Sequence, residues 1–289
     1  MIHPSPNAFK KACYLQGFCQ KLAVMTPQRI DETFARLRAK GEKAFIAYIG
    51  AGDPNLETTR ALALTLEKCG VDLLELGIPF SDPLADGIVN QMSAQRALEA
   101  GTTVRGVLQC VRAIRRESSI PIVLYTYMNP LQSFGMAAFH EEAEAAGVDG
   151  MLILDLPPEE DHGAFRIKRI RLIAPTTPPE RIAKITARAE GFIYYVSREG
   201  VTGEQATVAA SLEEHVKEIR KTTALPIAVG FGISNPEQAG QVARCADAVV
   251  VGSAIVKRIG ERGRAPELLE EVASFVRPLV EAVKSARGR

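Results

Sequence analysis

Eight short apolar runs alternate with helical stretches along this chain, and that alternation constrains the fold more than any other feature of the sequence. The runs cover residues 44–49, 73–77, 122–127, 151–156, 170–174, 192–197, 227–232 and 248–251. Most are continuously apolar, which is typical of parallel strands that are covered by helices. Eight β–α units in series close naturally into a barrel. The sequence therefore predicts an α/β protein with a single domain, a (β/α)₈ TIM barrel.

The segments between the runs carry helix signals. Helices are predicted over residues 56–68, 103–116, 137–146, 159–169, 179–189, 212–221, 236–245 and 266–286. A leading helix is expected to begin at Thr26-Pro27, a cap followed by proline, and to end at Gly41. Pro236 marks another helix start and Gly70 another helix end. Each predicted strand is thus separated from the next by a candidate crossover helix.

An open, doubly wound sheet also reads as alternating strands and helices, so it is the competing architecture. Its dinucleotide signature, G-x-G-x-x-G, would follow the first strand. That position, residues 50–54, reads Gly-Ala-Gly-Asp-Pro, in which the aspartate and the proline break the pattern. The barrel is therefore preferred.

Composition narrows the function. The chain has 289 residues, with Lys+Arg 35 against Asp+Glu 34 and a net charge of +1, so the large positive charge of a nucleic-acid binder is missing. No apolar run approaches the roughly 18 residues that cross a membrane. The five cysteines are scattered without metal-ligand spacing, which predicts reduced thiols, a cytoplasmic location and no metal site. None of the four histidines falls at a strand end, so we expect no catalytic histidine.

The first residues are expected to lie outside the barrel. Residues 1–24 contain lysines and glutamines rather than the continuous apolar core and small-residue cleavage site of a secretory signal. We predict a disordered N-terminal extension over residues 1–24 and the (β/α)₈ barrel over residues 25–289.

Catalytic groups of barrel enzymes lie at the carboxyl ends of the strands, and two carboxylates stand out there. Glu75 lies within the apolar run Leu-Leu-Glu-Leu, where burial raises a carboxyl pKa and suits it to proton transfer. Asp86 follows in a loop rich in proline and glycine. The alternatives are an internal ion pair for Glu75 and a turn-forming role for Asp86.

Glycine clusters follow the last three predicted strands. Residues 200–203 read Gly-Val-Thr-Gly, residues 230–234 read Gly-Phe-Gly-Ile-Ser, and residues 252–254 read Gly-Ser-Ala. Glycine lets backbone N–H groups approach a ligand, and barrel enzymes often hold a phosphate between the loops after the seventh and eighth strands. The clusters predict a phosphate site there.

A longer segment connects these features to a known family. Residues 74–87 read Leu-Glu-Leu-Gly-Ile-Pro-Phe-Ser-Asp-Pro-Leu-Ala-Asp-Gly, and residues 52–54, 173–178, 197–203, 230–234 and 252–256 support the match. From about residue 25 to about residue 259 the chain resembles the tryptophan synthase alpha-subunit family. The resemblance implies a lyase of tryptophan biosynthesis that cleaves indole-3-glycerol phosphate to indole and glyceraldehyde 3-phosphate by a retro-aldol reaction.

The resemblance also implies roles for single residues. Glu75 matches the family's general acid–base group, and Asp86 matches the carboxylate that binds the indole N–H. Residues implied to bind the substrate or its phosphate are Tyr48, Tyr127, Tyr194, Thr202, Gly203, Gly232, Gly252 and Ser253. Arg198 and Thr202 fall on the family's mobile lid. No metal or organic cofactor is implied in this chain.

The family works with a partner. The resemblance implies a tryptophan synthase beta subunit that carries pyridoxal phosphate, receives indole through a tunnel and assembles as alpha2-beta2. Residues 79–83, with Asp82, and the Asn129-Pro130 turn match the family's contact loops.

Two features depart from the family pattern. Ile88 stands where the family usually has proline after Asp-Gly, which predicts a less rigid loop around Asp86. Residues 159–170 are fewer than a full helix and loop require, which predicts a truncated fourth helix and a less stable barrel.

Three alternatives remain at this stage. One is a lyase that releases indole without a partner. A second is a barrel that activates a beta subunit after losing its own catalysis. A third is a sugar-phosphate isomerase, which would share the phosphate site but not the segment over residues 74–87.

Overall fold

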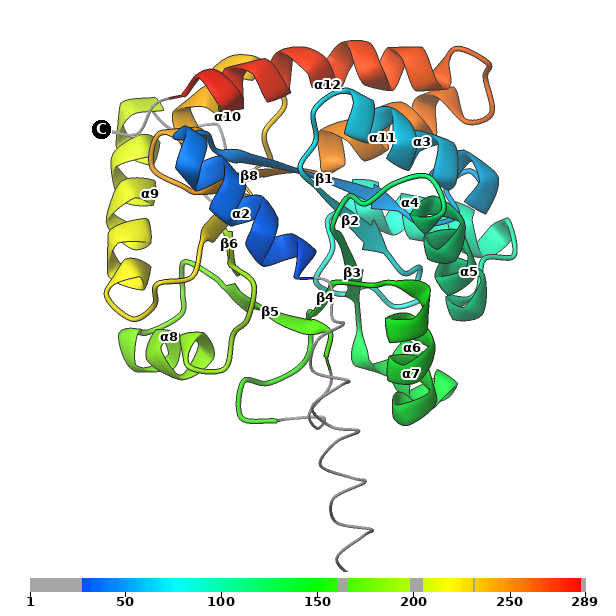
Figure 1. The fold of residues 1–289 in the computed structure, drawn as a ribbon, viewed down its shortest axis with the longest axis horizontal. Helices are drawn as coiled ribbons and strands as arrows, with labels where there is room; N and C mark the ends of the chain where they lie inside the picture. The colour runs from blue at the N-terminus through cyan, green and yellow to red at the C-terminus, as the bar shows by residue number, and fades with distance from the viewer. Residues whose placement is uncertain (1–27, 161–165, 198–204, 231, 287–289) are drawn as a thin grey trace, which may run out of the picture.

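The protein is a closed barrel of eight parallel strands, each paired with its neighbours in chain order (Figure 1). The computed structural model describes residues 28–160, 166–197, 205–230 and 232–286. The strands are β1 (Ala44–Gly50), β2 (Leu73–Gly77), β3 (Ile122–Thr126), β4 (Gly150–Ile153), β5 (Lys168–Ile173), β6 (Ile193–Val196), β7 (Ile227–Gly230) and β8 (Ala248–Val251). The predicted TIM barrel is confirmed, and every predicted strand is present within a few residues.

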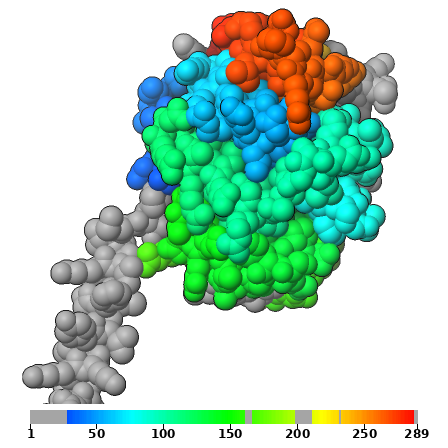
Figure 2. Space-filling view, turned by 90° about the vertical axis from the view of Figure 1, so that its right-hand side faces the viewer, coloured from blue at the N-terminus to red at the C-terminus, as the bar shows by residue number. Residues whose placement is uncertain are grey.

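Helices surround the barrel. They are α2 (Arg29–Lys40), α3 (Leu56–Lys68), α4 (Ile88–Glu99), α5 (Val104–Arg115), α6 (Met128–Phe134), α7 (Met136–Ala146), α8 (Pro179–Thr186), α9 (Gln205–Arg220), α10 (Pro236–Ala243), α11 (Ser253–Arg262) and α12 (Leu268–Ser285). Of these, α4, α6 and α11 are absent from the helices predicted above. Figure 2 shows one side of this layer, where the C-terminal segment in orange lies against segments of the first half of the chain.

The strands present two apolar faces because successive side chains point to opposite sides. Outward side chains such as Phe45 and Leu74 pack under the helices, and inward ones such as Ile46, Leu73 and Val123 fill the barrel. A continuous apolar run is therefore what each strand needs.

Helix α2 closes the amino end of the barrel. Its buried residues Ile30, Phe34 and Leu37 recur at helical spacing and join the same cluster as the barrel interior. The Phe34 ring contacts Phe192, with ring centroids 5.9 Å apart. This helix begins at Arg29 with Gln28 as N-cap, rather than at Thr26-Pro27 as predicted, and ends as expected at Gly41 in the left-handed conformation.

An acidic residue shortly before each even-numbered strand ties the amino ends of neighbouring strands together. The carboxylates of Asp72, Asp149 and Asp247 each accept a backbone N–H from the first or second residue of the preceding odd-numbered strand, at 2.8 to 2.9 Å. Glu190 accepts the N–H of Arg169 at 3.0 Å in the same way. Each carboxylate also forms an ion pair with a lysine or arginine side chain. The same kind of contact therefore joins neighbouring strands around the amino end of the barrel.

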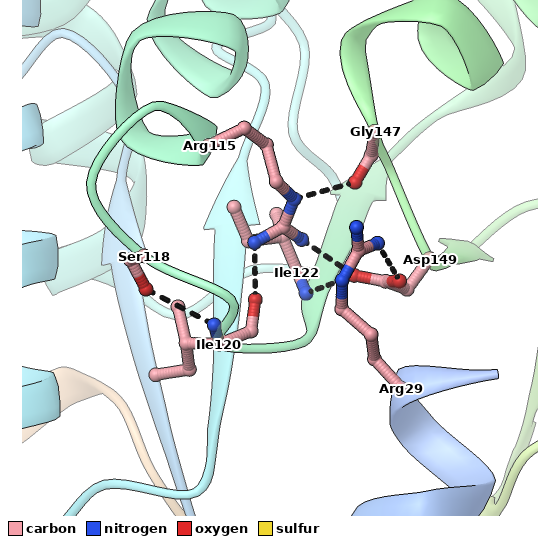
Figure 3. A network of polar contacts seen from close by, with 7 residues as sticks. All are labelled: Arg29, Arg115, Ser118, Ile120, Ile122, Gly147 and Asp149. Carbon is pink, nitrogen blue, oxygen red and sulfur yellow. Dashed lines mark hydrogen bonds and ion pairs between the residues drawn. The ribbon is translucent and has the colours of Figure 1, made fainter. Parts of the chain in front are cut away.

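Figure 3 shows these contacts around Asp149. Its side chain is 2% exposed and binds the guanidinium groups of Arg29 at 2.8 Å and Arg115 at 2.5 Å. Arg115 also donates to the carbonyl oxygens of Gly147 and Ile120. Burial lowers the pKa of Arg115 to about 10, and the Asp149 charge opposes that fall. The network joins α2 and α5 to β3 and β4.

The predicted helix over residues 159–169 is wrong at its end, because Lys168 and Arg169 belong to β5. Glu160 is irregular and residues 166–167 form a bend, so no helix of three turns fits between β4 and β5. The described residues therefore do not contradict a truncated fourth helix, but residues 161–165 lie outside them, so its truncation stays a prediction. The expected extension over residues 1–24 lies outside the described residues.

None of the described helices combines the length and the apolar character that a membrane span requires.

Candidate active site

A cavity of about 700 Å³ opens at the carboxyl end of the barrel. Its wall includes Tyr48, Asp86, Tyr194, Gly252 and Ser253. The rest of the wall is largely apolar and comes from strand ends, with Leu154, Leu172, Val196 and Val250 among its members. Such a cavity suits a flat apolar ring that carries a polar tail.

Glu75 lies in β2 on the inward face, level with Tyr48 of β1 and Val123 of β3. Its side chain is completely buried, and neither carboxylate oxygen has a hydrogen-bond partner within the described part of the chain. Desolvation raises the pKa of Glu75 to about 8. The internal ion pair considered as an alternative is therefore not found among the described residues, and the group is poised to carry a proton near neutral pH.

Glu75 lies next to residues that line the cavity. The pKa of Tyr194 is raised first by burial and next by the charge of Glu75. The pKa of Tyr48 is raised first by burial, next by the charge of Asp86 and then by that of Glu75. Both tyrosines therefore stay protonated.

Asp86 is held at the cavity wall by side chains from β3, from Tyr127 directly after that strand, and from α4. The hydroxyl of Tyr127 donates to Oδ2 at 2.7 Å, and the hydroxyl of Tyr125 donates to Oδ1 at 3.0 Å. The amide of Asn90 donates to Oδ1 at 3.4 Å. An aspartate that only forms a turn does not need hydrogen bonds from three other side chains. These donors therefore indicate a functional carboxylate.

The loop around Asp86 is also tied through its backbone. The Ala85 N–H donates to the Tyr127 hydroxyl at 3.1 Å, and Gln91 donates to the Asp86 carbonyl at 2.8 Å. Ile88, at the position where a proline was expected, is the first residue of α4 and is 69% exposed. Contacts from β3 and α4 therefore connect the loop to the barrel where the proline is missing.

Helix α4, which carries Asn90 and Gln91, is fixed to the end of β1 by a buried carboxylate. Asp53, 1% exposed, accepts from Arg96 Nε at 2.9 Å, from Arg96 Nη2 at 2.7 Å and from the Ser93 hydroxyl at 2.6 Å. Paired contacts of this kind are the stronger form of a charged hydrogen bond. The Asp53 contacts determine where α4 places its first turn.

Glycines at strand ends make room for the tyrosines. A Cβ on Gly230 would lie 2.7 Å from the hydroxyl oxygen of Tyr194, and one on Gly252 would lie 3.2 Å from Cβ of Tyr48. The cavity therefore depends on these positions having no side chain.

Helix α11 begins at the cavity. Its N-cap is Gly252, its first residue is Ser253, and its first turn contains no acidic residue. The first N–H groups of a helix lack intrahelical partners and attract anions. Gly232, also on the lining, adopts a φ of +62°, which suits glycine. This edge of the cavity can hold a phosphate without lysine or arginine.

The structure brings most of the predicted site residues together. Tyr48, Asp86, Tyr194, Gly232, Gly252 and Ser253 line one cavity, Tyr127 contacts Asp86 beside it, and Glu75 lies beneath it. Arg198, Thr202 and Gly203 lie outside the described residues. Within the described ranges, no group of three or more His, Cys, Asp or Glu side chains could hold a metal ion.

Sequence reasoning missed Tyr125 and Asn90. Tyr125 is two residues before Tyr127 and so faces the same side of its strand, a signal that could have found it. Asn90 lies one helical turn after Asp86, but α4 itself was not predicted.

Comparison with known proteins agrees with this geometry. The profile of the family described as tryptophan synthase alpha chain matches residues 34–284. The tryptophan synthase alpha chain of Opitutus terrae is 53% identical over 263 residues, covering 89% of this chain and 99% of the relative. The one from Citrifermentans bemidjiense is 48% identical over 261 residues, covering 88% and 97%.

A solved structure is similar along nearly its whole length. Tryptophan synthase subunit alpha from Legionella pneumophila superposes with a TM-score of 0.82 at 38% identity, over 90% of this chain and 99% of that one.

A closed barrel of eight parallel strands with a cavity at their carboxyl ends has the architecture of a (β/α)₈-barrel enzyme. The family match and the identities now make the assignment specific. The chain belongs to the tryptophan synthase alpha chain family. It is a lyase that cleaves indole-3-glycerol phosphate and passes the indole to a beta subunit.

Proposed function

We propose that Glu75 and Asp86 carry out the cleavage, with Glu75 moving the protons and Asp86 stabilising the charge on the ring. The observation that carries this proposal is the pairing of a buried, unpartnered carboxyl group with a nearby carboxylate held by three donors. One group can keep a proton at neutral pH, and the other accepts hydrogen bonds.

The chemistry balances on these two groups. Protonated Glu75 gives its proton to C3 of the indole ring, which leaves a positive charge on the ring nitrogen. Asp86 accepts a hydrogen bond from that N–H and stabilises the charge in a cavity of low dielectric. Glu75, now ionised, takes the proton of the hydroxyl on the carbon attached to C3. The carbon–carbon bond breaks, its electrons return to the ring, and the hydroxyl-bearing carbon becomes an aldehyde.

The rest of the cavity binds the two ends of the substrate. The indole ring lies against the apolar wall beside Tyr48, Tyr127 and Tyr194. The phosphate lies at the start of α11, against Gly232, Gly252 and Ser253, and Thr202 and Gly203 complete the site. No metal or cofactor is needed, because the reaction requires only proton transfer and charge stabilisation.

The partner is a beta subunit that carries pyridoxal phosphate, and the assembly is alpha2-beta2 in the cytoplasm. Residues 79–83 with Asp82, and the Asn129-Pro130 turn, form the contact surface in this proposal. Leu84 is 92% exposed and adjoins the first of these segments, and Ile88 and Met92 follow at helical spacing. Large apolar side chains so exposed are typical of a surface that is covered in an assembly.

One assay tests the proposal, namely indole release from indole-3-glycerol phosphate by the chain alone and with a beta subunit. We expect slow release alone and stimulation by the partner. Equal turnover in both conditions indicates a free-standing lyase. No release in either condition, with activation of the beta reaction retained, indicates a non-catalytic activator.

A further inference from the structure

The side chain of Tyr125 is a further component of the site that the family roles above do not include. Tyr125 and Tyr127 lie two residues apart, so both point inward from the end of β3. Their hydroxyls donate to different oxygens of Asp86, Tyr125 to Oδ1 and Tyr127 to Oδ2. The two tyrosines therefore hold the carboxylate from both oxygens.

The two hydroxyls have different surroundings. The Tyr127 hydroxyl also accepts the Ala85 N–H, so it ties the loop as well as the carboxylate. Tyr125 lines the cavity, and its ring packs edge-on against Tyr48 with centroids 5.0 Å apart. Its hydroxyl is thus placed at the cavity wall by ring packing within the barrel.

The direction of the Tyr125 hydrogen bond is fixed. Burial, and after it the charge of Asp86, raise the pKa of Tyr125 far above its usual value. The phenol therefore keeps its proton and donates it to the carboxylate near neutral pH. A carboxylate oxygen has two acceptor positions, so Oδ2, which accepts from Tyr127, keeps one for a ligand while the bonds to Oδ1 hold the carboxylate plane.

We propose that Tyr125 is a positioning residue that orients the Asp86 carboxylate toward the indole N–H through its hydrogen bond to Oδ1. The proposal rests on the function proposed above. Without this hydroxyl, Oδ1 keeps only the 3.4 Å contact from Asn90 among the described residues. Tyr127 then holds the carboxylate at Oδ2 alone, so the carboxylate plane can turn about the bond to Cβ. Because positive charge appears on the ring nitrogen only during the reaction, a misaligned carboxylate lowers the rate more than it weakens substrate binding.

The test is Tyr125→Phe, which removes the hydroxyl and keeps the ring beside Tyr48. Single-turnover indole release and steady-state kcat and KM are measured for this variant and for the parent chain, both with the beta subunit. We expect kcat to fall about tenfold, as for loss of a hydrogen bond to a charged group, while KM changes less than about threefold.

Tyr195→Phe is the matched control. Tyr195 is a buried tyrosine, 2% exposed, that packs under the helices on the outward face of strand β6, stacked on His215. We expect its kcat to stay within about twofold of the parent value. Circular dichroism melting of both variants compares their folding.

A Tyr125→Phe kcat within twofold of the parent value overturns the proposal, whether or not KM rises. If Tyr125→Phe melts early, a crystal structure of the variant decides, because the proposal requires the Asp86 carboxylate to turn while the β3 backbone stays in place. A carboxylate that keeps its orientation overturns it. Failure of the proposed function itself is distinct, since the parent chain would then release no indole.

Discussion

The two ends of the barrel treat buried carboxylates in opposite ways. At the amino end, Asp72 and Asp149 are buried, yet each accepts a backbone N–H and pairs with a cation. Toward the carboxyl end, Glu75 is equally buried and has no hydrogen-bond partner within the described residues. Hydrogen bonds and ion pairs compensate the charges of Asp72 and Asp149, whereas burial without such partners favours the protonated form of Glu75.

This difference in partners indicates a different role for each end of the barrel. A buried charge with partners connects strands and helices, and its loss leaves the partners unsatisfied. A buried carboxyl group without partners costs stability when it ionises, and that cost is what allows it to hold a proton at neutral pH. The amino end of the barrel thus holds paired carboxylates that connect its elements, and the carboxyl end holds a carboxyl group that can carry a proton.

The largest effect is expected from Glu75→Gln. The variant keeps the shape of the side chain, but its amide cannot give and take a proton as a carboxyl group does. Indole release should therefore fall by roughly 10²–10⁴-fold. Indole formation is the measurement. More than a tenth of the parent rate would contradict the role of Glu75.

The stability of the same variant sharpens the comparison. Because burial raises the pKa of Glu75 from 4.5 to about 8, the folded state keeps a proton that the unfolded chain loses between these values. The stability from this group is complete below about pH 4.5 and is lost as the pH rises through about 8. Denaturant unfolding should therefore show that Glu75→Gln gains stability over the parent with rising pH, by a few kcal/mol, on the order of 1.4 per unit of pKa shift.

The amino end should respond in the reverse sense. Asp149→Ala leaves Arg115 without its anionic partner and should destabilise the protein by about 3–5 kcal/mol. Turnover per folded molecule should stay unchanged, because the site is at the other end. Lys217→Ala, which breaks an exposed pair with Glu213, is the control and should cost less than about 1 kcal/mol. Loss of turnover in folded Asp149→Ala would break the distinction between the two ends.

A smaller, graded effect is expected from pH. The first proton transfer needs protonated Glu75, so kcat/KM for indole release should fall about tenfold per unit as the pH rises beyond about 8. A pH–rate profile from 6 to 10 measures it. A profile that is flat across this range would show that another group supplies the proton.

The smallest effect concerns the space around the tyrosines. A Cβ on Gly77 would lie 2.9 Å from Cζ of Tyr48, so Gly77→Ala must displace that ring. We expect a loss of about 1–3 kcal/mol in unfolding free energy, as for overpacking elsewhere. Gly87→Ala is the control, since a Cβ there meets nothing within 4 Å. Equal stability of the two variants would contradict this account of the strand end.

Sequence reasoning predicted the barrel because the pattern that it reads is local. Each strand is a continuous apolar run that needs helices on one face and the barrel interior on the other, so its composition is the same whichever neighbours it pairs with. Helix α4 was missed because its buried residues, Ser93 and Ala97, do not form an apolar stripe. Helix α11 has such a stripe in Ile255, Val256 and Ile259, so that pattern could have found it.

The candidate site was predicted in part. Glu75 stood out because a carboxylate within Leu-Leu-Glu-Leu has few ways to be satisfied. Tyr125 did not stand out, because a tyrosine in an apolar strand is an ordinary core residue unless its hydroxyl partner is known. That partner, Asp86, is 39 residues away in the sequence.

The sequence by itself determined the fold class and the positions of Glu75 and Asp86, because apolar periodicity and a charged residue in an apolar run are properties of neighbouring residues. Only the tertiary structure decided which carboxylates are paired and which one is left with its proton. Pairing depends on where distant segments meet, as when Arg29 and Arg115 reach Asp149 while no such cation in the described chain reaches Glu75. Barrel closure sets those meetings, and with them the pKa that the chemistry requires.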